Sequence, residues 1–306
     1  MNKKLAYIFV AMAAALWGVI GLFVSQLYDL GFTTNQVVAV RALSATGFLA
    51  LYTLLTDWRR LRIRLSDTRY FIGTGVISIV LFNWCMFSAI RETSISVATI
   101  LLYTAPAFVT ILSRFLFNEA LTIRKVLALL ATLAGCGLVV GIGSTTDNPV
   151  SLYGILLGLG SGFFYALYSV FGKYALQKYD SLTVTLYTFV FAAIAITPFS
   201  HIQQVVPLLR KTEAWLYIAG LSFFSTTLAY LLYTKGLQVI ESSRASIVAT
   251  IEPVVASLIG LLVFQEMLSI GQYLGIGLVL AAVVIVQEPA TQPSDQALAN
   301  RDGAIY

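Results

Sequence analysis

The chain matches itself at an offset of 147 residues. Pro106 precedes Glu119 by thirteen residues, and Pro253 precedes Glu266 by the same interval. The offset also relates four further pairs of identical or similar residues: Ala98 and Ala245, Thr99 and Ser246, Ile100 and Ile247, and Thr122 and Ser269. A long internal period indicates two copies of one structural unit, so the fold must be a duplicated one.

Each copy is too apolar for a soluble domain. Hydrophobic residues make up 58% of the 306 residues, charged residues only 11%, and the mean hydropathy is +0.86. A soluble domain carries about 25% charged residues. Apolar runs of about 20 residues, the length that crosses a bilayer, recur along the whole chain. These properties predict an all-α polytopic membrane protein.

The apolar runs predict ten transmembrane helices, at 5–27, 34–56, 69–90, 94–116, 123–143, 152–173, 182–200, 213–236, 243–264 and 269–287. Lys3 and Lys4 precede the first run, as in a secretory signal, but the run continues to Leu27 and therefore predicts a retained span. The short linkers leave no room for an extramembrane domain. The polar tail, 289–306, is expected to be disordered and cytoplasmic.

The basic residues predict the orientation. With the N-terminus in the cytoplasm, only Arg91, Arg210 and Lys211 lie on the outer side. Fourteen lie on the cytoplasmic side: Lys3, Lys4, Arg59, Arg60, Arg62, Arg64, Arg69, Arg114, Arg124, Lys125, Lys173, Lys178, Lys235 and Arg244. This excess predicts a plasma (cytoplasmic) membrane protein with both termini in the cytoplasm. The net charge of +5 reflects topology and predicts no nucleic-acid partner.

The predicted repeats are residues 1–143 and 144–288. Each holds five spans, an odd number, so the second repeat enters the membrane in the opposite direction. Glu119 then lies in a cytoplasmic loop and Glu266 in an external one. Inverted repeats are typical of alternating-access transporters, whose substrate site lies near the midplane between the repeats. Two mirrored packings of similar energy provide the inward-open and outward-open states.

Several motifs are familiar: Ala-Leu-Trp17-Gly18 in the first span, Arg41-Ala-Leu in the second, ATILLYTAPAFVTILSRFLFNEALT (98–122) and ASIVATIEPVVASLIGLLVFQEMLSIGQYLGIGLVL (245–280). Over nearly its whole length the chain resembles the drug/metabolite transporter superfamily, EamA type. The resemblance implies ten helices, a central cavity lined by spans 1, 3, 4, 6, 8 and 9, and contact between the last helices of the two halves. Members often carry a basic residue late in span 1, where this chain has Val24 and Ser25; the matching place in span 6 holds Lys173.

The paired prolines fall in the middle of spans 4 and 9. They leave the carbonyls of Leu102 and Ala249 without helical donors, and in hydrocarbon such groups need other partners. We interpret Pro106 and Pro253 as hinges that widen a central cavity and let each half rock, since they occupy equivalent places. The alternative is a pair of static kinks packed against neighbouring helices.

Glu252 and Arg41 are the ionisable residues well inside predicted spans. A charge at the bilayer centre costs about 3 kcal/mol even on lenient scales, so each needs a partner or a watery cavity. Glu252 is the candidate for proton coupling or for binding a substrate amine; a protonated, hydrogen-bonded structural role is the alternative. For Arg41, in a span that the resemblance makes peripheral, snorkelling or a bond to a loop carbonyl is the favoured interpretation.

Aromatic and hydroxyl side chains supply the predicted binding surface. Tyrosine pairs one turn apart share a helix face, and their polar tips suit an amphiphilic solute. The predicted substrate-binding set is Trp17, Ser78, Phe82, Asn83, Tyr103, Tyr165, Tyr168, Tyr230, Tyr233 and Glu252, with Trp84 in the same spans. Ordinary core packing is the alternative for any single member, and about half of the aromatic residues are expected to contact the cavity.

Two further patterns concern packing and loops. Glycines four residues apart predict close helix contacts, at Gly154, Gly158 and Gly162 of span 6, Gly137 and Gly141 of span 5, and Gly271 and Gly275 of span 10. Thr122 and Ser269 are expected to be the N-caps of spans 5 and 10. Glu119 and Glu266, close to these helix starts, are interpreted as residues that fix the loops rather than bind substrate.

These features predict a secondary transporter that exports small amphiphilic metabolites such as amino acids. A multidrug exporter of lipophilic cations is the alternative, because Glu252 and aromatic rings suit a cation; a non-transporting membrane protein is a third reading. An enzyme is not expected, because embedded catalytic groups do not cluster. No cofactor and no metal is predicted. Substrate, direction of flux, proton coupling and oligomeric state stay open, with a monomer containing an internal pseudo-dimer as one arrangement.

Overall fold

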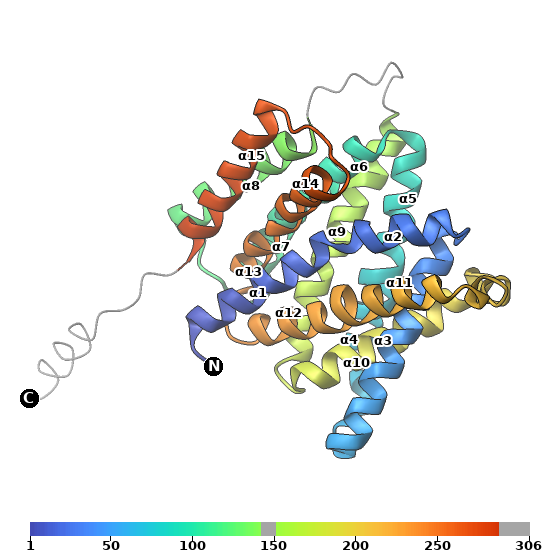
Figure 1. Ribbon diagram of the computed structural model, residues 1–306. Coiled ribbons are helices and arrows are strands. Elements are labelled where there is room, and N and C mark those ends of the chain that lie inside the picture. Colours follow the sequence, from blue (N-terminus) through green and yellow to red (C-terminus); the bar gives the residue numbers. More distant parts are fainter. Residues whose placement is uncertain (142–150, 288–306) are drawn as a thin grey trace, which may run out of the picture.

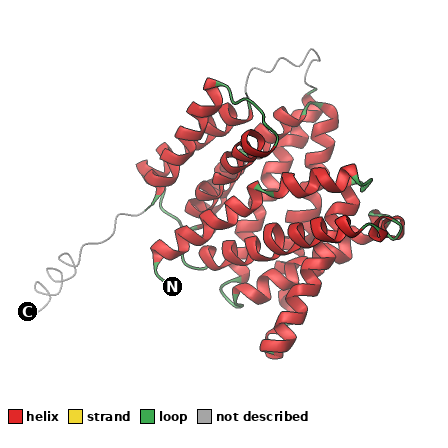
Figure 2. Ribbon diagram, viewed as in Figure 1, coloured by secondary structure: helices red, strands yellow, loops and turns green. Residues whose placement is uncertain are grey.

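The computed structural model describes residues 1–141 and 151–287, and within them every regular element is a helix (Figure 2). Nine stretches among the described residues are long and apolar enough to cross a membrane, and a shorter apolar helix, Ile270–Val286, follows them. The prediction of an all-helical membrane protein is confirmed. The predicted boundary between the repeats at 143–144 and the predicted tail, 289–306, lie outside the described residues.

The helices of the first half are α1 (Lys3–Gly18), α2 (Ile20–Asp29), α3 (Thr34–Thr56), α4 (Thr68–Phe71), the π-helical η3 (Ile72–Leu81), α5 (Phe82–Glu92), α6 (Ile95–Leu102), α7 (Ala105–Leu116) and α8 (Ile123–Val140). Those of the second half are α9 (Leu152–Ala175), α10 (Ser181–Ile196), α11 (Thr212–Ser222), the π-helical η7 (Phe223–Leu228), α12 (Ala229–Leu237), α13 (Ser242–Ala249), α14 (Ile251–Val263) and α15 (Ile270–Val286). Short 3-10 turns occupy Trp58–Leu61, Leu65–Asp67, Thr197–Phe199, Ile202–Val205 and Leu208–Arg210.

The 147-residue offset of the sequence is also an offset of the structure. The starts of α3, α6 and α8 in the first half correspond at that offset to the starts of α10, α13 and α15 in the second. The π-helical stretches correspond too, because η3 ends at Leu81 and η7 ends at Leu228. Because π-helical stretches are rare, their recurrence at equivalent positions indicates that the two halves have the same fold. Each half traverses the bundle five times, so the halves run in opposite directions.

The first span of each half packs against the other half. α1 packs along α12, and α9 packs against η3 and α5, so the first span of each half contacts the third span of the other half (Figure 1). α8 and α15 lie side by side at the upper left of Figure 1. The largest hydrophobic cluster accordingly draws residues from both halves, including Val10, Phe71, Phe189 and Leu237. The core of this protein is the interface between its repeats.

Helix starts follow ordinary capping chemistry. Thr122 accepts a hydrogen bond from the Lys125 amide at the start of α8, and Ser269 accepts one from the Gln272 amide at the start of α15. Both predicted N-caps are therefore confirmed. Gln272 also reaches back to the Ser269 amide and completes a capping box.

The contact between α8 and α15 depends on two glycines. A Cβ atom on Gly135 would lie 2.9 Å from the carbonyl oxygen of Gly275, and a Cβ on Gly275 would lie 2.7 Å from that of Gly135. The predicted meeting of spans 5 and 10 is confirmed, and the predicted Gly275 forms the seam together with Gly135, which was not predicted. Gly141 instead ends α8 with a φ of +91°, and a Cβ on Gly271 would meet only Ser269.

The two ends of the bundle differ in charge. We call the basic face the end that carries the N-terminus and the loops following α3, α7, α9 and α12. The distal face is the opposite end, with the loops following α2, α5, α10 and α14. Most of the Lys and Arg residues in the described part of the chain lie toward the basic face, and the sequence predicts this face to be cytoplasmic.

Gly275→Ala is expected to destabilise the protein, because its methyl group would contact backbone atoms of α8 at 2.7 Å. Over-packing of this kind costs about 1–3 kcal/mol. The matched control is Gly277→Ala in the same helix, where an added Cβ meets nothing within 4 Å. There the higher helix propensity of alanine leaves Tm unchanged or raises it. Thermal unfolding in detergent measures both variants, and equal Tm values would contradict a tight seam.

Candidate functional site

Spans 4 and 9 are each interrupted at the centre of the bundle. α6 ends at Leu102 and α7 begins at Ala105, while α13 ends at Ala249 and α14 begins at Ile251. Pro106 and Pro253 lie in the first turn of the helix that follows each interruption. A proline is tolerated there because the first amides of a helix have no intrahelical acceptor. The prolines thus begin new helices, where the sequence predicts kinks in continuous ones.

The other half of the protein packs closely on each interruption. A Cβ atom on Gly162 of α9 would lie 2.9 Å from the Leu101 carbonyl oxygen, and one on Gly18 of α1 would lie 2.7 Å from the Glu252 carbonyl oxygen. Backbone freed from helical bonding needs such shielding or internal partners inside a membrane. Thr104 and Thr250 supply partners by donating to the carbonyls of Leu101 and Ile247, each at 2.6 Å.

A cavity of about 720 Å³ lies beside the interruptions, between the two halves. The six spans that the resemblance implies all contribute to its wall, and span 2 contributes as well. Its mouth is at the distal face, where Tyr28, Thr34, Ile95 and Phe264 line it. Seven residues of the predicted binding set line the cavity: Trp17, Phe82, Asn83, Tyr103, Tyr165, Tyr230 and Glu252.

An aromatic cluster forms the floor of the cavity. Trp17 packs against Tyr230 and Tyr233 with ring centroids 5.1 Å apart in both pairs, and Tyr168 lies 5.1 Å from Tyr230. Tyr233 and Ser169 share a hydrogen bond of 2.6 Å. These rings are buried, and two small voids, of about 20 and 10 Å³, lie among and beside them.

The remaining predicted residues lie outside the open cavity. Ser78, Tyr168 and Tyr233 border the small voids at the floor. Pro106 lines one of those voids, and Pro253 is buried in α14. Trp84 is 57% exposed on the outside of the bundle. Helical periodicity alone does not distinguish the floor of a cavity from its wall, because both faces are apolar and aromatic.

Arg41 is the residue that sequence reasoning placed wrongly. It lines the cavity from α3, instead of snorkelling at the periphery. Its guanidinium acts electrostatically on Tyr230 and on the carboxylate of Glu252, which lines the same cavity from α14. Glu252 also accepts a long hydrogen bond of 3.4 Å from the Tyr165 hydroxyl. Apart from Glu266 at its mouth, the cavity is therefore lined by one carboxylate, Glu252, and one guanidinium, Arg41, contributed by opposite halves.

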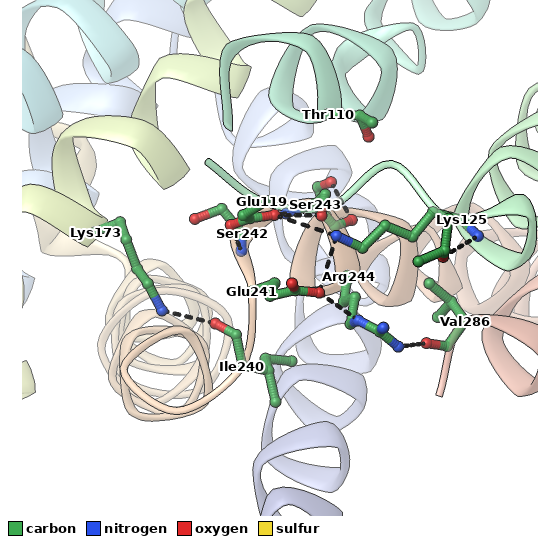
Figure 3. Close-up of polar contacts among 12 residues, drawn as sticks. Thr110, Glu119, Lys125, Lys173, Ile240, Glu241, Ser242, Ser243, Arg244 and Val286 are labelled. Carbon is green, nitrogen blue, oxygen red and sulfur yellow. Dashed lines mark hydrogen bonds and ion pairs between the residues drawn. The ribbon is translucent and has the colours of Figure 1, made fainter. Parts of the chain in front are cut away.

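The basic face is closed by a polar network centred on Glu119 (Figure 3). This carboxylate accepts hydrogen bonds from the Ser242 amide at 2.7 Å and the Ser243 amide at 3.1 Å, and a further short one from the Ser243 hydroxyl. Glu119 belongs to the first half, and both serines begin α13 of the second half. The expected role at its own helix start is thus corrected: Glu119 caps a helix of the other repeat.

Charged side chains surround this cap (Figure 3). Lys125, which is 1% exposed, lies 3.7 Å from Glu119 and 2.9 Å from Glu241. Glu241 also pairs with Arg244 at 2.5 Å, and Arg244 donates to the carbonyl of Val286 at the end of α15. Burial raises the pKa of Glu241, but hydrogen bonds from Lys125 and Arg244 outweigh it and hold the pKa below its usual value. The Glu241 carboxylate is therefore ionised at neutral pH.

Lys173 completes the closure from α9. Its ammonium donates to the carbonyls of Leu237 at 2.7 Å and Ile240 at 2.8 Å, at the end of α12. Sequence reasoning noted Lys173 as a family feature but found no role for Lys125, Glu241 or the two serines. The available signal was that Glu119 and Lys125 flank the predicted loop between spans 4 and 5. The sequence does not indicate which helix these two side chains contact.

Comparisons with known proteins agree with this architecture. The model of the EamA-like transporter family matches the chain twice, at residues 4–141 and 152–287. An uncharacterized transporter of Archaeoglobus fulgidus is 29% identical over 277 residues, covering 90% of this chain and 94% of that protein. The uncharacterized inner membrane transporter YicL of Salmonella typhimurium is 23% identical over 280 residues, which cover 90% of this chain and 93% of that protein. A crystal structure with 17% sequence identity matches with a TM-score of 0.77 over 99% of this chain and 100% of its own, which shows a shared fold.

Cysteine labelling at two repeat-related positions tests the one-sided opening. Thr99 lines the open cavity, whereas its counterpart Ser246 is 7% exposed beneath the floor. In a background without Cys85 and Cys136, Thr99→Cys is expected to react with an impermeant maleimide at least ten-fold faster than Ser246→Cys, because water reaches only the former. A ten-fold difference in rate corresponds to about 1.4 kcal/mol for exposing the buried position. Equal labelling rates would contradict a cavity open at one face.

Proposed function

Because the chain belongs to the EamA-like transporter family, which both of its halves match, we propose that it is a secondary transporter exporting small amphiphilic metabolites, in particular amino acids, by alternating access. The family is one of membrane transporters rather than enzymes, and a transporter acts on a small-molecule substrate.

The observation that carries the substrate class is the pairing of Arg41 with Glu252 across one cavity. A zwitterion presents a carboxylate and an ammonium group, and the cavity offers one partner of opposite sign for each. The surrounding rings of Trp17, Phe82 and Tyr103 supply an apolar surface for a side chain. Binding such a substrate neutralises both embedded charges, whose isolation in a membrane is costly.

The same arrangement argues against two other substrate classes. A phosphorylated compound calls for several cations, and Arg41 is the one Lys or Arg among the described residues that line the cavity. A lipophilic cation is attracted by Glu252 and the aromatic rings but repelled by Arg41. Export of lipophilic cations is therefore the second candidate, and the experiments below separate it from the first.

The orientation is part of the proposal. The excess of Lys and Arg at the basic face supports a cytoplasmic location for that face and for the N-terminus, in the plasma membrane. The cavity would then be open to the outside, the state from which an exporter releases its substrate. Pro106 and Pro253, at the interruptions between α6 and α7 and between α13 and α14, are the proposed hinges.

Transport of three related solutes tests the substrate class. We expect reconstituted liposomes to transport phenylalanine in preference to phenethylamine or phenylpropionate, which each lack one charge. Arg41→Gln should lower phenylalanine transport by about 10- to 150-fold, the worth of a charged hydrogen bond, and raise phenethylamine transport, because the cation no longer faces the guanidinium. A cationic dye is assayed in parallel. Transport of the dye or the amine in preference to phenylalanine would favour the multidrug alternative.

Glu252→Gln tests proton coupling. If the Glu252 carboxyl carries the coupled proton, the variant is expected to lose uptake driven by a pH gradient and to keep the exchange of substrate across the membrane, with a raised KM because the partner of the substrate ammonium has lost its charge. Gradient-driven uptake and counterflow exchange are measured on the same liposomes. A variant that retains full gradient-driven transport would exclude Glu252 as the coupling residue.

A further inference from the structure

The loops that follow α7 and α14 have the same geometry in both halves. Asn118 has a φ of +52° and Gln265, its counterpart at the 147-residue offset, has a φ of +57°. The next residues, Glu119 and Glu266, direct their amides to equivalent carbonyls, at distances of 3.2 and 3.0 Å. A non-glycine residue in the left-handed region is uncommon and costs conformational energy. Its recurrence at equivalent positions indicates that both repeats require this loop conformation.

The two carboxylates nevertheless make different contacts. Glu119 is 8% exposed and caps α13 through Ser242 and Ser243. Glu266 is exposed at the mouth of the open cavity, and an added Cβ on Gly260 would lie 2.6 Å from its carboxylate. It is therefore folded back along its own helix. One glutamate joins the two halves at the closed face, whereas within the described residues the other is folded back on its own half at the open face.

The structure also contains a matching pair of backbone donors for the Glu266 carboxylate. The counterparts of Ser242 and Ser243 are Ile95 and Ser96, the first two residues of α6. Both helices have eight residues, and in both the first backbone bond within the helix joins equivalent positions, from Ala245 and from Ala98. The first amides of such a helix lack intrahelical acceptors and attract a carboxylate. Ile95 is 69% exposed and lines the same cavity mouth as Glu266.

We propose that the distal face closes by the mirror image of the contact seen at the basic face. In the opposite state Glu266 leaves Gly260 and caps α6 at the amides of Ile95 and Ser96, while Glu119 releases α13. The two contacts, which we call the latches, alternate: the Glu119 latch holds the state that is open at the distal face, and the Glu266 latch holds the state that is open at the basic face. This assignment rests on the alternating-access mechanism proposed above and adds the residues that hold each state.

The surroundings of the latches differ, and this sets which state is preferred. Lys125, Glu241 and Arg244 reinforce the Glu119 latch with charged pairs at 2.9 and 2.5 Å. Their counterparts at the distal latch are Gln272, Ser94 and Val97, which carry no charge. Gln272 instead donates to the carbonyl of Val139. The state closed at the basic face is therefore the more populated one without substrate.

Paired cysteines test the assignment in the background without Cys85 and Cys136. Glu119→Cys with Ser243→Cys is expected to form a disulfide at once on mild oxidation and to stop transport. Glu266→Cys with Ser96→Cys should crosslink slowly, because the state that joins them is the minor one. Adding Glu119→Ala should speed the second crosslink about 2- to 30-fold, since a helix cap is lost from the competing state. Glu213→Gln, an exposed acid of the distal face, is the control and should change neither rate.

The outcomes separate the latch from the mechanism itself. If Glu266→Cys with Ser96→Cys never crosslinks while substrate transport continues, the distal latch is wrong and alternating access stands. If Thr99→Cys and Ser246→Cys fail to exchange accessibility during transport, alternating access itself is wrong. Glu119→Gln, which keeps one acceptor oxygen, should give a smaller acceleration than Glu119→Ala at an unchanged Tm; equal effects of both with a lowered Tm would reduce Glu119 to a folding role.

Discussion

A backbone group freed from helical bonding inside a membrane must find another partner, and this constraint governs the whole molecule. Spans 4 and 9 are interrupted at Tyr103–Thr104 and at Thr250, where no lipid can satisfy the backbone. The first span of the opposite half covers each interruption: α9 packs on α6 and α7, and α1 packs on α13 and α14. Because the cover comes from the other repeat, neither half is complete alone. The packing of each first span against the other half, the shared core and the central cavity all follow from this requirement.

The duplicated plan explains how one sequence provides two states. Equivalent helices, equivalent loops and equivalent interruptions give the two faces the same closing surfaces. In the structure one face uses them and the other does not. The aromatic floor of Trp17, Tyr230 and Tyr233 and the cap that Glu119 provides to α13 close the basic face, while the distal mouth is open. Packed interfaces of this kind have discrete arrangements rather than a continuum, so a transporter built from them switches between two.

Sequence reasoning succeeded where a local pattern carries the information. Apolar length gave the spans to within a few residues, and the N-caps at Thr122 and Ser269 were visible as hydroxyls before apolar runs. It failed for side chains whose role depends on which helix faces them. Arg41 is indistinguishable in sequence from a snorkelling arginine until α3 is placed beside the cavity. The sequence analysis missed Gly135 and chose Gly137 and Gly141, because these two glycines have the four-residue spacing typical of helix contacts. Which glycine of α8 faces α15 depends on the rotation of α8 about its axis, and the spacing does not contain that information.

By itself the sequence determined the class, the number of spans, the duplication and the opposite directions of the halves, because bilayer thickness and odd parity leave no alternative. It also determined which residue types line the centre of the bundle. Only the tertiary structure decided that Glu119 caps a helix of the other repeat, that Arg41 and Glu252 share one cavity, and that the bundle is open at one face. The two halves carry nearly the same local signals, and the difference between them arises from long-range packing that a linear pattern does not contain.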